Sequence, residues 1–209
     1  QMCCPSTIDV SCDGELTADC SKCASTCLYC SGLCTGGGIT PFNDTSIKDA
    51  VKAWCDDPDS AAGVYGKISA WDTSEVTNMS WLFAKPDFTP AYCSTYAAFN
   101  EDLSKWNVSR VTDMGNMFKY ASSFNSDISA WDVSRVTDMA RMFRSASVFN
   151  SDVSSWDVSS VTTMYAMFYG ASDFNSDISS WNVSRVETMQ GMFREASNFS
   201  SVVSSWDVS

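Results

Sequence analysis

Hydrophobic positions recur along most of the chain with a fixed spacing of 25 residues. Within one unit, phenylalanine, isoleucine or valine, tryptophan and two methionines stand among serine, threonine, asparagine and aspartate. A fixed period with one recurring apolar set predicts a repeat solenoid, in which each unit forms one coil of a stack. The tryptophans that follow this step are Trp106, Trp131, Trp156, Trp181 and Trp206.

Two phenylalanine rows follow the same step. Because every unit carries these rings and the tryptophans at the same positions, we interpret them as core rows, with an aromatic ligand stripe as the alternative. The first row is Phe99, Phe124, Phe149, Phe174 and Phe199, and the second, each after a methionine, is Phe118, Phe143, Phe168 and Phe193.

Each unit predicts two kinds of local structure. The stretch from Phe124 to Ile128 is typical of a short strand, and stacked coils would join such strands into a parallel sheet. Met139, Met142 and Phe143 have helical spacing, which predicts one helical or 3₁₀ turn on the opposite wall.

Three segments are predicted. Residues 1–40 form a cysteine-rich head, residues 41–66 a helical N-terminal cap, and residues 67–209 the solenoid. In the cap, Asp44 or Thr45 is the expected N-cap of a helix over Ile47–Cys55 that covers the first coil with Ile47, Val51 and Trp54. The first repeat carries an insertion near 85–94, and the last repeat is incomplete.

Ten cysteines indicate disulfides made in an oxidising compartment. Five of them fall on one face of a predicted short helix between residues 20 and 34, and Cys93 is expected to tie the insertion to Cys55. The alternative for the two CxxC pairs is a metal or iron–sulfur site, although their spacer is short for a zinc knuckle. The full set is Cys3, Cys4, Cys12, Cys20, Cys23, Cys27, Cys30, Cys34, Cys55 and Cys93.

The repeated phrase FNSDISAWDVSRVTDMARMF, with its core W-[DN]-V-S-x-V-T-x-M, resembles the BspA-family leucine-rich-repeat surface proteins. The stretch from Ile47 to Phe83 is similar to the cap and first repeat of members from eukaryotic microbes. The resemblance covers about residues 40–209 and leaves out the cysteine-rich head. It implies a right-handed leucine-rich-repeat-like solenoid, secretion or surface display, and adhesive or structural work, with no catalytic residues to transfer.

Charge and composition narrow the function further. The 25 acidic and 13 basic residues give a net charge of −12, which disfavours nucleic acid and anionic membranes as partners. The absence of histidine excludes histidine-dependent catalysis and histidine-ligated metals. No stretch approaches the length of a transmembrane helix. We therefore expect a protein that is not an enzyme.

Stacking would turn polar positions into rows about 4.8 Å apart. Asparagines at 100, 125, 150 and 175 are expected to bond from coil to coil through their amides. Arg110, Arg135 and Arg185 are expected to pair with acids on adjacent coils. We expect no cofactor, with calcium as the alternative, bridging coils through Asp132 or Asp157 and a carboxylate row. That row is Asp102, Asp127, Asp152 and Asp177.

Other features suggest an extracellular location. The chain begins at Gln1, as expected of a mature protein from which a signal has been removed. With the disulfides, the N-x-S/T sequons indicate glycosylation of some of their asparagines. The candidates are Asn43, Asn78, Asn107, Asn182 and Asn198.

These features predict a secreted structural or adhesive protein that assembles head-to-tail into filaments or a coat. The cysteine-rich head would dock on the open end of the last coil, unless further coils of a longer array cover that end. The alternative is a monomeric recognition module that binds an extracellular protein or a glycan on its sheet face. The near-identical Asn, Asp and Ser positions of that face show little variation between coils, which favours the first hypothesis.

Overall fold

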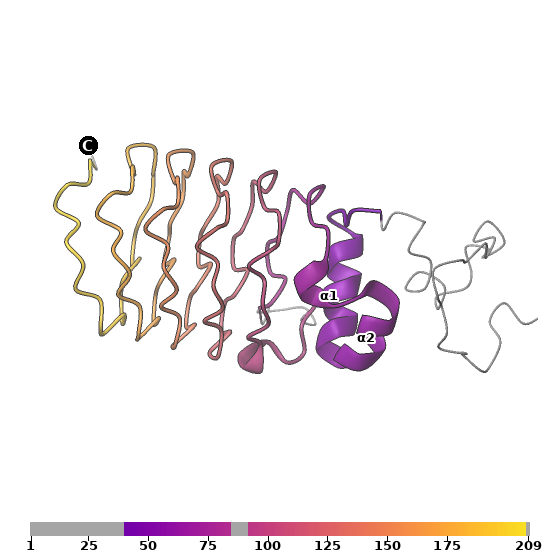
Figure 1. Ribbon diagram of the computed structural model, residues 1–209. Helices are drawn as coiled ribbons and strands as arrows, with labels where there is room; N and C mark the ends of the chain where they lie inside the picture. The colour runs from indigo at the N-terminus through magenta and orange to yellow at the C-terminus, as the bar shows by residue number, and fades with distance from the viewer. Residues whose placement is uncertain (1–39, 85–91, 208–209) are drawn as a thin grey trace, which may run out of the picture.

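The computed structural model describes residues 40–84 and 92–207 of the 209. Two helices lie at one end of a stack of coils that continues to the C-terminal end (Figure 1). The helices are α1 (Ser46–Asp56) and α2 (Pro58–Tyr65), and the 3₁₀ helices are η2 (Ile68–Ala70) and η3 (Tyr96–Ala98). The expected head at 1–40, with its eight cysteines, lies outside the described residues apart from residue 40.

The N-terminus of α1 is held by a residue that the sequence analysis did not select. The Asn43 side-chain oxygen accepts hydrogen bonds from the backbone N–H of Thr45 (2.9 Å) and of Ser46 (3.0 Å). Thr45 makes no side-chain cap bond. Asp44 instead accepts from the N–H of Thr77 (2.7 Å), in the first coil. Thr45 therefore occupies the expected N-cap position without a capping bond of its own, and Asp44 does not cap the helix because it joins the cap to the stack.

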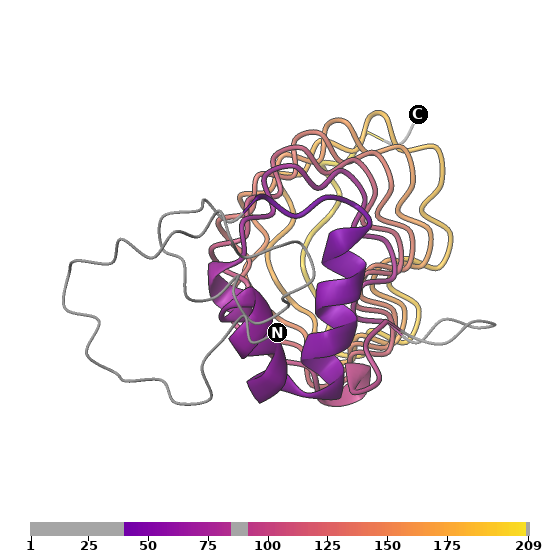
Figure 2. The same cartoon turned by 90° about the vertical axis from the view of Figure 1, so that its right-hand side faces the viewer.

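Helix α1 lies across the open end of the first coil (Figure 2). Its buried side chains include Ile47 and Val51, which have no exposed surface, and Trp54. The Trp54 ring meets Trp71 of the first coil edge-on at 5.9 Å, and Phe42 packs on the same Trp71 ring at 5.0 Å. The cap thus closes the core with aromatic side chains rather than with polar ones.

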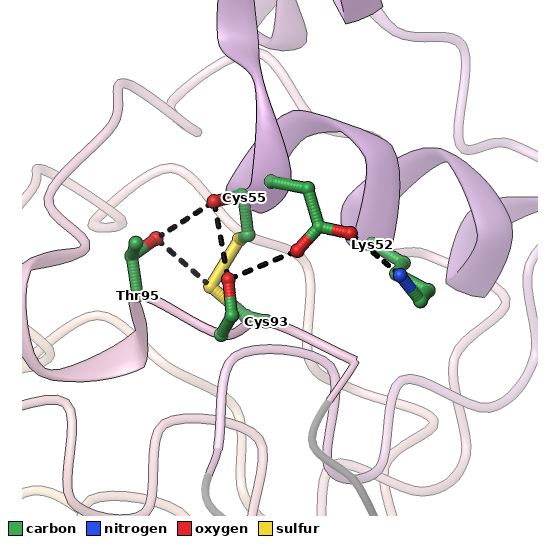
Figure 3. Close-up of a disulfide and its surroundings, with 6 residues drawn as sticks. Lys52, Cys55, Cys93 and Thr95 are labelled. Carbon is green, nitrogen blue, oxygen red and sulfur yellow. Dashed lines mark hydrogen bonds and ion pairs between the residues drawn. A yellow bond between two sulfur atoms is a disulfide. The ribbon is translucent and has the colours of Figure 1, made fainter.

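A disulfide ties α1 to the segment that follows the insertion. Cys55, near the end of α1, is bonded to Cys93, and both residues are buried (Figure 3). The Thr95 hydroxyl donates to the carbonyl of Cys55 at 3.4 Å, beside the sulfur atoms. The sequence pointed to this pairing of Cys55 with Cys93.

The coils are joined by backbone hydrogen bonds along one wall. In one coil, the N–H groups of alternate residues donate to carbonyls 24 residues further on, at 2.7–3.1 Å. Between them, bonds from Met142 N–H to Met139 O and from Ala146 N–H to Phe143 O close successive turns within the coil. The outward donors are Met139, Arg141, Phe143 and Ser145.

Local structure in this wall differs from the expected helical turn. The third residue of each turn has a positive φ, 56° at Arg141 and 59° at Ser145, as in type II turns. Left-handed residues at this spacing are incompatible with a helix, but they aim alternate N–H groups at the neighbouring coil. The prediction of a helical or 3₁₀ turn at Met139–Phe143 is therefore wrong.

The expected short strands are also absent from the described residues. Parallel pairing there is limited to isolated bridges that link Asn78, Asp113, Asp138, Thr163 and Thr188 in succession. The stretch from Phe124 to Ile128, where a strand was expected, carries no such bridge. Backbone pairing between coils is found instead in the turns that begin near Asp138, because the residues of those turns direct their N–H groups along the axis of the stack.

The core consists of rings that lie over one another. Trp131, Trp156 and Trp181 are each 4% exposed, and successive rings are 6.5 Å apart and within 4° of parallel. Phe143 stacks on Phe168 of the next coil at 5.7 Å, and on Phe149 of its own coil at 3.8 Å. The rings therefore form continuous columns through the described coils.

Each tryptophan of the column also makes a hydrogen bond that the sequence did not predict. The indole N–H of Trp156 donates to the carbonyl of Ile128 in the preceding coil at 3.2 Å, and that of Trp181 donates to Val153 O at 3.0 Å. The ring thereby fills the core and satisfies a backbone carbonyl at its edge.

Candidate functional site

The asparagine side chains link neighbouring coils by accepting hydrogen bonds from backbone N–H groups. The Asn125 side-chain oxygen accepts from the N–H of Asn150 at 2.8 Å, and Asn150 accepts from the N–H of Asn175 at 2.7 Å. The prediction that the asparagine amides bond from coil to coil is confirmed, and the donor in each case is the backbone N–H of the next asparagine in the row. Because no β-pairing is present here, each side-chain amide takes the place of the backbone carbonyl that a strand would supply.

Replacing Asn150 tests this role. In Asn150→Ala, the N–H of Asn175 loses its acceptor, and we expect the free energy of unfolding to fall by about 1 kcal/mol. Asn150→Asp, which retains the acceptor oxygen, is the matched control and should lose less. Urea unfolding measures both values, and equal losses would show that the hydrogen bond is not the cause.

The carboxylates of the aspartate row accept hydrogen bonds from residues of their own coils. Asp127 accepts from the N–H (2.9 Å) and the hydroxyl (2.7 Å) of Ser129, an Asx-turn that lowers the pKa of Asp127. Asp152 and Asp177 accept in the same way from the serine two residues on, and their pKa values are also lowered. Asp102, with Ser104, completes the row.

These turns give the recurring aspartates a structural role within their own coils. The carboxylate oxygens bond within their own coils, and the same pattern holds Asp132 and Asp157. Among residues 40–84 and 92–207, no group of three or more acidic or cysteine side chains is placed to hold a metal ion. The calcium hypothesis therefore gains no support from the geometry of this row.

A different pair of carboxylates is half-buried. Asp113 and Asp138 occupy adjacent coils, and an oxygen of each lies 3.2–3.3 Å from the position that a side chain on Gly115 would take. Asp138 is half-buried and accepts from the N–H of Ala140 at 2.7 Å. Burial, with a smaller contribution from Asp113, raises the pKa of Asp138. Ionised Asp138 therefore opposes folding.

We expect Asp138→Asn to raise the melting temperature at pH 7. The raised pKa means that ionisation costs more in the folded state, so the penalty is complete above that pKa and disappears below the ordinary value of 3.8. The gain should therefore shrink as the pH falls toward 3.8. Asp127→Asn, at an exposed site whose pKa is lowered, should give no gain. Thermal melts at several pH values would contradict this if both variants behaved alike.

The sequon asparagines differ in their surroundings. Asn107 and Asn182 are exposed, and only their side-chain oxygens are used, by Ser109 and Ser184. Asn43 and Asn198 are also exposed. Asn78 is half-buried, and its amide nitrogen donates to Asp113 at 3.1 Å. The amide nitrogen of Asn198 also donates, to Asp173 at 3.3 Å. Asn43, Asn107 and Asn182 therefore remain the better candidates for glycosylation, while Asn78 and Asn198 have their amide nitrogens engaged.

Two segments of each coil carry different charges. The acidic segment, 124–133 in the second full coil, and its equivalents 99–108, 149–158 and 174–183 hold seven acidic residues and one lysine. The arginine segment, 134–146, and its equivalents 109–121, 159–171 and 184–196 hold every arginine of the chain. These are Arg110, Arg135, Arg141, Arg144, Arg185 and Arg194.

Surface residues in the arginine segments vary from coil to coil. The Arg141 guanidinium lies 4.7 Å from the ring centre of Tyr165, and Tyr169 lies between Arg144 (4.9 Å) and Arg194 (5.7 Å). In the first full coil, the positions of Arg141 and Arg144 hold Asn116 and Lys119, both buried. The inference of slight variation between coils holds for the acidic segments and is wrong for this wall.

Only one of the three arginines expected to form pairs does so within the described residues. Arg110 lies 2.5 Å from the Glu75 carboxylate in the preceding coil. Arg135 and Arg185 are exposed and form no ion pair with the described part of the chain. Both line an open groove of about 710 Å³ together with the threonine row.

Among the described residues, no helix is long and apolar enough to cross a bilayer.

Comparison with known proteins gives a family and no closer relative. The model of the family described as "Mycoplasma protein of unknown function, DUF285" matches twice, over residues 59–143 and 123–209. The matches include α2, the first coil and the stack, and together they cover residues 59–209. No curated protein and no solved structure matches the chain. The chain therefore belongs to the DUF285 family, which is related to the BspA-like repeat proteins.

Proposed function

We propose that this is a secreted or surface-displayed protein with an adhesive or structural role, built as a right-handed leucine-rich-repeat-like solenoid. The observation that supports it best is the contrast between its segments. The core and the acidic segments repeat from coil to coil, while the arginine segments vary and carry every arginine. A stack held by identical rows provides a rigid support, and the variable residues provide the surface for binding.

The disulfide and the exposed sequons support the extracellular location. Cys55 and Cys93 are bonded, as suits an oxidising compartment, and Asn107 and Asn182 are accessible to glycosylation. Antibody labelling of intact cells from the source, with mass spectrometry of the recovered protein, tests the proposal. We expect surface labelling, glycan mass and oxidised cysteines. Labelling only after permeabilisation, with free thiols, would contradict it.

Head-to-tail assembly is a second candidate, favoured by the last described coil. Val202 is 68% exposed and stands where the preceding coils carry Asp152 and Asp177. Trp206 and Phe199 are only partly buried, although their equivalents are covered. An apolar coil face can be covered by a second copy of the chain or by further coils.

Light scattering over a range of concentrations tests this assembly. We expect particles that grow with concentration, and we expect Val202→Asp, which restores the residue type of the row, to weaken their formation. Ser205→Asp, at an exposed position in the same coil, is the charge-matched control. A monomer at every concentration would exclude assembly and would leave the adhesive proposal to its own test.

A further inference from the structure

The groove on the arginine wall has an unusual lining for so acidic a chain. It is open, has a volume of about 710 Å³, and crosses neighbouring coils. Two arginines and five hydroxyl side chains line it, with one carboxylate. The lining residues are Thr112, Ser134, Arg135, Thr137, Ser160, Thr162, Arg185 and Glu187.

The two arginines are available to a ligand. The described residues supply Arg110 with a carboxylate partner and place Arg141 and Arg144 over tyrosine rings. Among the same residues, Arg135 and Arg185 have neither a carboxylate partner nor a tyrosine ring beside them. These two residues stand at the same position two coils apart, so their backbones are about 10 Å apart, from two steps of about 4.8 Å. The groove therefore offers two separate forks of N–H donors to anionic groups.

The hydroxyl row presents acceptors. Thr137 Oγ1 donates its proton to the carbonyl of Thr112 at 3.1 Å, and Thr162 Oγ1 donates to that of Thr137 at 3.1 Å. Ser134 Oγ likewise donates to Asp132 at 2.6 Å. With their protons directed at these acceptors, the hydroxyl oxygens keep lone pairs for donors in the groove. A matching ligand therefore carries both anionic groups and closely spaced O–H donors.

We propose that this groove binds an acidic glycan, laid across the coils. Its carboxylate or sulfate groups would meet Arg135 and Arg185, and its hydroxyls would donate to Thr112, Thr137 and Thr162. This inference deepens the proposed adhesive function by naming the ligand class. Sugar hydroxyls are dense along such a chain, and the arginines are spaced by roughly the length of two sugar residues.

Other polyanions fit the groove less well. A nucleic acid or polyphosphate offers few O–H donors to the threonine oxygens, and the net charge of −12 repels a densely charged polymer. An acidic peptide has one backbone N–H per residue, and the acidic segments would repel it too. A glycan that carries one anionic group every one or two sugars has the lower charge density that the surroundings favour.

Calorimetric titration of the full chain with three soluble polysaccharides tests the proposal. Polygalacturonate is the carboxylated probe, a sparsely substituted dextran sulfate the sulfated one and unmodified dextran the neutral one. We expect binding of one or both acidic probes and none of dextran. The Arg135→Gln/Arg185→Gln variant should bind at least tenfold more weakly, since each change removes charge-assisted hydrogen bonds. Both residues are exposed, so folding should be unaffected.

Two further variants make the test specific. Lys67→Gln/Lys105→Gln removes the same charge outside the groove and should bind like the original protein. Glu187→Gln removes the only carboxylate of the lining and should strengthen binding. Equal losses in the arginine and lysine variants, or no binding of either acidic probe, would overturn the groove assignment. Those outcomes leave surface labelling of intact cells, the test of the adhesive role, unaffected.

Discussion

Trp156→Ala should lower the free energy of unfolding by about 3–5 kcal/mol, the range for large aromatic side chains removed from a core. Trp156 is 4% exposed and stacks between Trp131 and Trp181 at 6.5 Å on either side. Its removal leaves a cavity that touches both neighbouring coils. It also leaves the carbonyl of Ile128 without its indole donor. Because coil stability depends on nearest neighbours, both interfaces weaken together.

Trp206→Ala is the matched control for this prediction. Trp206 occupies the same position in the last described coil, is only partly buried, and stacks on Trp181 alone among the described residues. Its loss should cost clearly less. Trp156→Phe separates the two contributions, since it keeps most of the ring packing and removes the indole N–H, at about 1–3 kcal/mol. Urea unfolding followed by circular dichroism gives all three values, and equal losses at 156 and 206 would contradict the stacking argument.

Removal of the Cys55–Cys93 disulfide should cost about 4 kcal/mol. The bond closes a stretch of 38 residues, and cross-links over loops of this length constrain the unfolded chain by about that amount. The bond also holds the segment after the insertion against α1, where the hydroxyl of Ser94 donates to Asp56 at 3.0 Å. Without it, we expect the cap and the first coil to become less stable before the later coils do.

The measurement uses Cys55→Ala/Cys93→Ala in oxidising buffer. This design leaves the other eight cysteines unchanged, whereas a reductant acts on all ten. Hydrogen exchange resolved by position should show loss of protection in α1 and the first coil, with the coil around Trp181 protected as before. If the variant unfolds at the same urea concentration as the original, the bond contributes nothing to stability.

The period of 25 residues was enough to identify the core. A residue type that recurs at each step occupies the same place in every coil, and Trp131, Phe143 and Phe149 are indeed found buried in continuous columns. The Cys55–Cys93 pair and the apolar face of α1 also followed from position in the sequence. These features depend on burial of large apolar side chains, and sequence patterns report burial well.

The local backbone could not be predicted in the same way. Strand and helical turn were both expected from spacing, yet the structure has successive turns with left-handed residues at Arg141 and Ser145. Nothing in either residue type favours a positive φ, which is tolerated because their N–H groups find carbonyls in the next coil. The role of Asn150 could not be predicted either. Its side-chain oxygen accepts from the N–H of Asn175 in place of a strand carbonyl, and this contact exists only when the two coils are stacked.

The order of the residues was sufficient to identify the side chains that lie inside, because burial repeats with each coil and gives the apolar residues their period of 25. Which polar groups meet is set by the packing of the coils against one another. Arg110 lies beside Glu75, while Arg135 and Arg185 face a groove lined by threonine oxygens from three coils. Hydrogen bonds and ion pairs depend on distances of a few ångströms between residues far apart in the chain. Those distances are fixed by the stacking of the coils, which no single unit contains.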